Sequence, residues 1–150
     1  MKLAEALILR ADLQKRLEQL RSRLTASALV QEGEEPAEDP RTLLKELDQV
    51  TGELQDLIAR INLTNAAEQR EGSTLTELLS RREVLQQKIS VLQSLLDTAS
   101  HTVMRGSRNE VKIRSTVSVP ELRHQTDELS RELRLLDTAI QSANWLIELH

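Results

Sequence analysis

Glu121 and His124 are three residues apart in a segment with helical periodicity, so both side chains lie on one face of the predicted helix. Glu-x-x-His is the ligand pattern of carboxylate-bridged di-iron bundles, which need two such motifs and two further inward-facing Glu residues. The other histidines, His101 and His150, have no Glu three residues before them. Glu121 also fits the acidic position of a capping box that begins at Ser118. We therefore interpret the motif as a helix start and predict no two-metal site.

A looser ligand set consists of Asp97, His101 and His124. Asp97 and His101 are four residues apart, and His124 joins them if the connection between two helices brings their ends together. Three exposed histidines are the simpler interpretation. The sequence also lacks Cys, a Gly-rich phosphate loop and a Ser at a strand-to-helix elbow. We predict no catalytic set and no cofactor, with His101, Glu121 and His124 as the candidate metal ligands of a remote enzymatic alternative.

Acidic residues are concentrated in one Gly- and Pro-containing segment between two helices. They are Glu32, Glu34, Glu35, Glu38 and Asp39. Their spacing differs from that of an EF-hand loop, so a solvated connection is favoured over a cation site. Asp39 is a suitable N-cap for a helix whose first residue is Pro40.

The elements that must position these residues are helices. Apolar residues recur at alternating steps of three and four, as at Leu13, Leu17, Leu20 and Leu24, which places them on one helical stripe. Four segments show this pattern, over about residues 3–29, 40–61, 75–99 and 118–150. The sequence therefore predicts a mainly α protein, a bundle of four long amphipathic helices in a single domain over residues 1–150.

One segment between the third and fourth helices departs from the helical period. Val111, Ile113, Val117 and Val119 alternate with polar residues, a pattern that predicts one short β-strand over about residues 110–119. A lone strand needs a partner for its backbone groups. A tight hairpin about residues 114–115 is one solution, and pairing with the same segment of a second copy is the favoured one. We therefore predict a homo-oligomer with these four residues at its interface.

The composition favours neither a nucleic-acid partner nor a membrane partner. The net charge is −4 and no long basic run occurs, so no nucleic-acid partner is expected. Charges interrupt every apolar run before it reaches the length of a membrane span, which predicts no membrane partner and a cytoplasmic protein. Trp145 is the single aromatic residue, so aliphatic side chains must fill the core. We expect Trp145 to pack in the core or in an interface.

Several short motifs along the chain form a recognisable set. They are the opening Met1-Lys2-Leu3-Ala4-Glu5-Ala6-Leu7, the Gln31–Pro36 loop, Ile61-Asn62-x-Thr64-Asn65, Ser107-Arg108-x-Glu110-Val111-Lys112 and Asn144-Trp145. Together they resemble a small bacterial family labelled septicolysin. The resemblance implies a helical bundle protein without an assigned activity.

The sequence leads to three functional hypotheses. The favoured one is a non-enzymatic structural or scaffolding protein that self-assembles through helix faces and the strand. The alternative is a regulatory module that binds a helix or strand of another, unidentified bacterial protein. The remote alternative is the metal-dependent enzyme described above.

Overall fold

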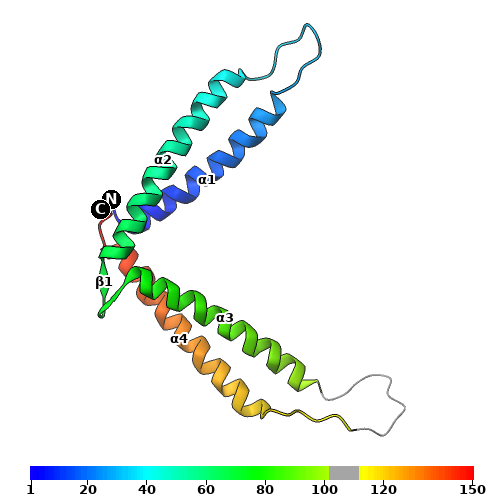
Figure 1. Cartoon of the computed structure of the whole chain (residues 1–150), viewed down its shortest axis with the longest axis vertical. Coiled ribbons are helices and arrows are strands. Elements are labelled where there is room, and N and C mark those ends of the chain that lie inside the picture. The colour runs from blue at the N-terminus through cyan, green and yellow to red at the C-terminus, as the bar shows by residue number, and fades with distance from the viewer. Residues whose placement is uncertain (102–111) are drawn as a thin grey trace. The chain divides into compact units, whose positions relative to one another are not determined.

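The computed structural model describes residues 1–101 and 112–150. Its helices are α1 (Leu3–Ala26), α2 (Pro40–Ala67), α3 (Leu75–Ser100) and α4 (Val119–Leu146), with strands β1 (Gln69–Arg70) and β2 (Ser73–Thr74) between α2 and α3 (Figure 1). The prediction of a mainly α protein with four long helices is confirmed. None of the helices in the described part of the chain is long and apolar enough to cross a membrane.

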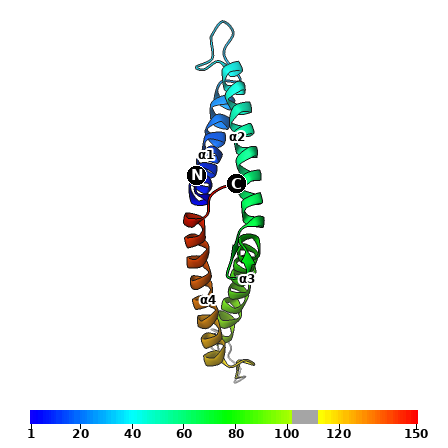
Figure 2. The ribbon, with the colours of Figure 1, turned by 90° about the vertical axis from the view of Figure 1, so that its left-hand side faces the viewer.

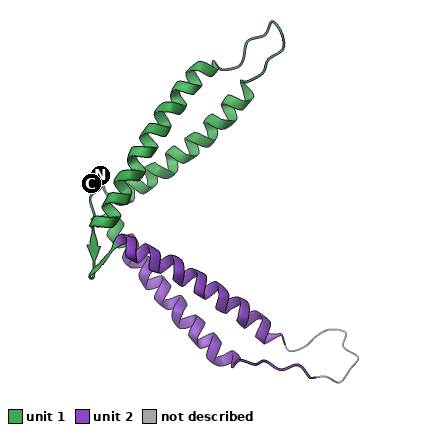
Figure 3. Ribbon diagram, in the orientation of Figure 1, with its two compact units in different colours: residues 1–74, 142–150 green, residues 75–141 purple. Residues whose placement is uncertain are grey.

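The chain divides into two compact units (Figure 3). Unit 1 contains residues 1–74 and 142–150, and unit 2 contains residues 75–141. The last residues of α4 therefore belong to unit 1, whereas the rest of that helix belongs to unit 2. This division does not test the prediction of a single domain over residues 1–150, which remains a prediction.

Unit 1 is built on the hairpin of α1 and α2, which lie side by side (Figures 1 and 2). Leu13 and Leu20 of α1 are buried, as are Leu43, Val50 and Leu57 of α2. Within each helix these residues are seven apart, the spacing that keeps side chains on the seam between two packed helices. The aliphatic stripes predicted from the sequence are therefore the buried faces of this hairpin.

The two ends of the chain close unit 1 through a short antiparallel bridge between Lys2 and Glu148. The Leu3 N–H donates to the main-chain oxygen of Ile147 at 2.9 Å, and the Leu149 N–H donates to that of Met1 at 2.9 Å. The Lys2 ammonium lies 2.6 Å from the Glu148 carboxylate. Hydrogen bonds from Lys2 and from the terminal amine hold the pKa of the Glu148 carboxyl below its ordinary value.

His150 is held against α2 by three polar contacts. Its N–H donates to the hydroxyl of the fully buried Thr64 at 3.0 Å, and its main-chain oxygen accepts from Arg60 Nε at 2.6 Å. The ring nitrogen Nε2 lies 2.8 Å from Glu68 Oε1. These contacts join residues far apart in the chain, and no periodic pattern in the sequence predicts them.

A tight hairpin connects α2 to α3. Gln69 pairs with Thr74 and Arg70 with Ser73, and the turn between them contains Glu71 at φ 50° and Gly72 at φ 83°. Positive φ at both turn residues is typical of the primed turns that match the twist of antiparallel strands. Strands of two residues are too short to show an alternating pattern in the sequence.

Unit 2 is the hairpin of α3 and α4, whose ribbons run side by side in both views (Figures 1 and 2). Leu85 and Ile89 of α3 are buried, as are Leu122, Thr126 and Leu136 of α4. The buried Thr126 hydroxyl donates to the main-chain oxygen of Leu122 at 2.8 Å, so it needs no partner from the other helix.

Two ion pairs join the helices of unit 2. Arg81 of α3 binds Glu132 of α4, and Arg82 binds Asp137 at 3.4 Å. Arg82 lies in the apolar stripe of α3, and its side chain is 31% exposed. The Arg82 guanidinium is therefore paired with a carboxylate at the edge of the hairpin's core.

The predicted strand over residues 110–119 is wrong wherever the structure describes it. Residues 112–118 are irregular with a bend at 116–117, and Val119 is the first residue of α4. Val111 lies outside the described residues. The Ser115 hydroxyl donates to the main-chain oxygen of Val117 at 2.7 Å and lies 3.3 Å from the Val117 N–H. This local turn engages backbone groups that a strand would need for a neighbour.

Replacing Leu43 by Ala should destabilise unit 1 by about 2–5 kcal/mol, because the side chain is 2% exposed and its loss leaves a cavity. Leu44 is the matched control, since it is the next residue of the same helix and is 50% exposed. Leu44→Ala should change the free energy of unfolding by no more than about 0.5 kcal/mol. Urea unfolding followed by circular dichroism measures both, and equal effects would contradict the described seam.

Candidate functional site

A hollow of about 640 Å³ lies at the loop end of unit 2. Its wall combines the last turn of α3 with the irregular segment before α4: Leu95, Asp97, Thr98, Ala99, His101, Ile113, Arg114, Ser115, Thr116 and Val117. This volume is in the range of sites that bind small molecules or side chains of a partner. The hollow is the candidate functional site of unit 2.

The apolar part of the wall includes two residues that the sequence predicted at an oligomer interface. Ile113 is 43% exposed and Val117 is 36% exposed, so both retain surface for a partner. Val119 is half-buried at the start of α4, apart from the lining of the hollow. Val111 lies outside the described residues. The structure thus brings Ile113 and Val117 together in a hollow, without the strand on which the prediction depended.

The polar part of the wall carries one unpaired cation. Arg114 is exposed and makes no ion pair within the described residues. His101 follows α3, and its Nδ1 contacts the main-chain oxygen of Asp97 four residues earlier. A guanidinium beside aliphatic side chains suits a partner that is apolar on one side and acidic on the other.

The three candidate metal ligands of the remote alternative lie apart from any acidic or histidine cluster in the described part of the chain. Glu121 lies in the first turn of α4, where its N–H is 3.4 Å from the Ser118 hydroxyl, in agreement with the capping interpretation. His124 is exposed on the same helix. Within residues 1–101 and 112–150, no three His, Cys, Asp or Glu side chains gather closely enough to hold an ion. His101, Glu121 and His124 therefore gain no support as a site.

An exposed apolar strip on α3 leads into the hollow. Val84 is 62% exposed, Val91 is 69% exposed and Leu95 is 42% exposed. With Lys88 they are spaced by four, three and four residues, so they lie on one face of α3, distinct from the buried seam. Leu95 belongs to both the strip and the hollow. We call Val84, Val91 and Leu95 the α3 strip.

The carboxyl-terminal part of the α3 strip lies in an uncharged stretch of the helix, whereas Val84 follows three charged residues. No charged residue occurs between Lys88 and Asp97, over two turns of helix. The Ser94 hydroxyl donates to the main-chain oxygen of Ser90 at 3.1 Å, so it is already satisfied within the helix. A surface without charges loses little hydration when it is covered, which is typical of the centre of a protein interface. The sequence contains this signal as a second seven-residue repeat, Val84 and Val91.

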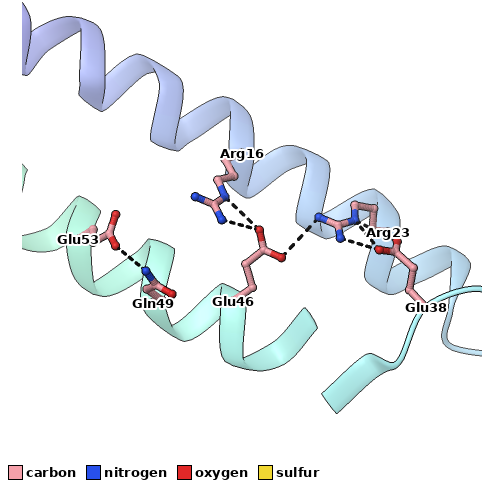
Figure 4. Close-up of polar contacts among 6 residues, drawn as sticks. All are labelled: Arg16, Arg23, Glu38, Glu46, Gln49 and Glu53. Atoms are coloured by element: carbon pink, nitrogen blue, oxygen red, sulfur yellow. Dashed lines mark hydrogen bonds and ion pairs between the residues drawn. The ribbon is translucent and has the colours of Figure 1, made fainter. Parts of the chain in front are cut away.

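The acidic segment between α1 and α2 is anchored at its end. Arg23 of α1 binds Glu38 through two nitrogens, at 2.6 and 3.0 Å, and Arg16 and Arg23 both approach Glu46 of α2 (Figure 4). The hydrogen bond from Arg23 holds the pKa of the Glu38 carboxyl below its ordinary value. Asp39 caps α2 by accepting from the Arg41 N–H at 3.0 Å.

Comparison with known proteins places the chain in a family. Residues 10–149 match a family of unknown function, DUF6847. The chain belongs to this family. No curated protein matches it. A crystal structure from Corynebacterium diphtheriae, described as a functionally unknown conserved protein, is 40% identical with a TM-score of 0.92, covering 100% of this chain and 99% of that one. Neither comparison supports the septicolysin label.

Replacing Glu38 by Gln should make unfolding less sensitive to acid. The Glu38 pKa is lowered in the folded protein, so its contribution to stability is present above the unfolded value of about 4.3 and is lost as the pH falls through the folded value. The native protein should therefore be more stable than Glu38→Gln at pH 7, and the difference should close in acid. Thermal unfolding as a function of pH measures this difference. Asp12→Asn, which removes an exposed carboxylate of α1 without an ion pair in the described residues, should give no such pH-dependent difference.

Proposed function

We propose that this protein is a non-catalytic structural protein that self-associates through the apolar surface of unit 2, formed by the α3 strip and the adjoining hollow. The observation that carries this proposal is the α3 strip, because Val84 and Val91 are each more than 60% exposed on a helix face that has no use within its own hairpin. Exposed apolar patches of this kind mark interaction sites.

The spacing of the strip favours a helix as its partner. Side chains at alternating steps of three and four form the seam of a coiled coil, and a second copy supplies the same seam. Covering the exposed fractions of Val84, Val91 and Leu95 contributes about 0.6–2 kcal/mol per side chain. Self-association would thus bury the apolar side chains that the hairpin of unit 2 leaves exposed.

The groups with shifted pKa values take part in holding unit 1 together. In the described part of the chain, the displaced values belong to Arg23, Glu38 and Glu148, which form surface ion pairs within unit 1. These shifts follow from contacts that hold the fold together, and none of these residues lines the hollow.

Val91→Lys is the variant that tests this interface. The native protein should be an oligomer by size-exclusion chromatography with light scattering, and Val91→Lys should weaken association by about tenfold or more, because covering the strip would then bury a charge. Leu44→Lys is the control, since it places the same charge at an exposed Leu on α2 of unit 1 and should leave the mass unchanged.

A native protein that stays monomeric at high concentration would overturn self-association. It would favour the alternative, a module that binds a helix of another protein through the same strip. An oligomer that survives Val91→Lys unchanged would show that unit 2 associates through a different face.

A further inference from the structure

We propose that the hollow of unit 2 receives the loop between α1 and α2 of a second copy. This inference rests on the proposed self-association and specifies one of its contacts. We call residues 29–35 the donor loop. The contact would be heterologous, since the donor loop and the hollow are different surfaces of the chain.

The donor loop presents apolar side chains that its own unit does not cover. Leu29 is 89% exposed and Val30 is 50% exposed, and both follow the C-cap of α1 at Ser27 within three residues. The Glu34 N–H donates to the main-chain oxygen of Gln31 at 3.0 Å, and Gly33 has φ 88°. This turn follows the two apolar residues immediately, so they lie at the base of a compact projecting loop.

The same loop carries carboxylates that the fold leaves unpaired. Glu38 is engaged by Arg23, and Asp39 caps α2. Glu32, Glu34 and Glu35 make no ion pair within residues 1–101 and 112–150. The donor loop therefore combines two exposed aliphatic side chains with three free negative charges.

The hollow has the complementary chemistry. Leu95, Ala99, Ile113 and Val117 form an aliphatic wall suited to Leu29 and Val30. Arg114 of the wall has no ion pair in the described residues, and the exposed Lys112 lies two residues before it. Asp97 adds one carboxylate, so these charges sum to a positive value.

Complementarity in both polarity and charge selects this occupant over a second α3 strip. Another α3 strip would bring aliphatic side chains and Lys88 toward Arg114, and like charges would then face each other. The donor loop brings aliphatic side chains and carboxylates together, and opposite charges across an interface speed encounter and fix register. Each copy has one donor loop and one hollow, so repeated contacts generate a ring or an open filament.

Two variants that each damage one side of the contact test this inference. Leu29→Ser with Val30→Ser damages the donor loop, and Arg114→Glu damages the hollow. Each variant should weaken assembly by about tenfold or more in light scattering. Arg134→Glu is the matched control, because Arg134 is an exposed arginine of α4 outside the hollow and should tolerate the change. Circular dichroism verifies that every variant keeps its helices.

Mixing the two variants distinguishes a heterologous contact from a symmetric one. The hollow variant retains an intact donor loop, and the loop variant retains an intact hollow. With Val91→Lys added to both variants, so that the α3 strips no longer associate, a concentrated equimolar mixture should form dimers that grow no further. In a single chain, Glu34→Lys with Glu35→Lys should restore assembly to Arg114→Glu by exchanging the charges. High salt should weaken the native assembly, because the contact includes exposed charges.

The outcomes separate this inference from the proposed function. If the native protein is an oligomer that Val91→Lys dissociates, while the donor-loop and Arg114 variants keep full assembly, the loop contact is wrong and self-association stands. Full-size oligomers from the mixed variants would also overturn it. A native monomer would overturn both proposals, whatever occupies the hollow.

Discussion

A helix in a two-helix hairpin buries one stripe of side chains and leaves much of its circumference in water. Because Phe and Tyr are absent and Trp145 is 55% exposed, aliphatic side chains make up these stripes. In unit 1 the stripes meet at Leu20, Leu43 and Val50, and in unit 2 at Leu85 and Leu122, all of them buried. Any further apolar side chain on these helices must remain exposed or find cover outside its hairpin, and the α3 strip is such a case.

Polar contacts then fix the register of the paired helices, which the aliphatic stripes leave undetermined. An aliphatic seam permits sliding by one heptad, whereas the geometry of a bidentate guanidinium–carboxylate pair is specific. Arg16, Arg23 and Glu46 join α1 to α2, and Arg23 also anchors the end of the acidic segment through Glu38 (Figure 4). Glu38 and Asp39 are thus engaged within unit 1, whereas the carboxylates of the donor loop make no ion pair in the described residues.

The proposed assembly follows from these two constraints together. Hairpins that bury one stripe per helix have surface to spare, and the surplus apolar side chains of unit 2 lie on α3 and in the hollow beside Ile113 and Val117. The donor loop of unit 1 carries three carboxylates that make no ion pair in the described residues. Members of the DUF6847 family and the similar protein from Corynebacterium diphtheriae provide natural variants in which these two features can be compared.

The sequence by itself determined the elements whose causes are local. The seven-residue repeats, the Asp39 cap with Pro40 and the Ser118 start of α4 are all confirmed, because helix formation and capping depend on neighbours within a few residues. Only the tertiary structure decided which partners those elements meet. The closure of Lys2 on Glu148, the contact of His150 with Thr64 and the hollow join residues that no short repeat relates. The predicted strand is wrong because a local pattern cannot supply a partner. An alternating pattern specifies which side chains share a face, but a strand also needs a neighbour for its backbone groups. Here the Ser115 turn engages the backbone groups of Val117 instead.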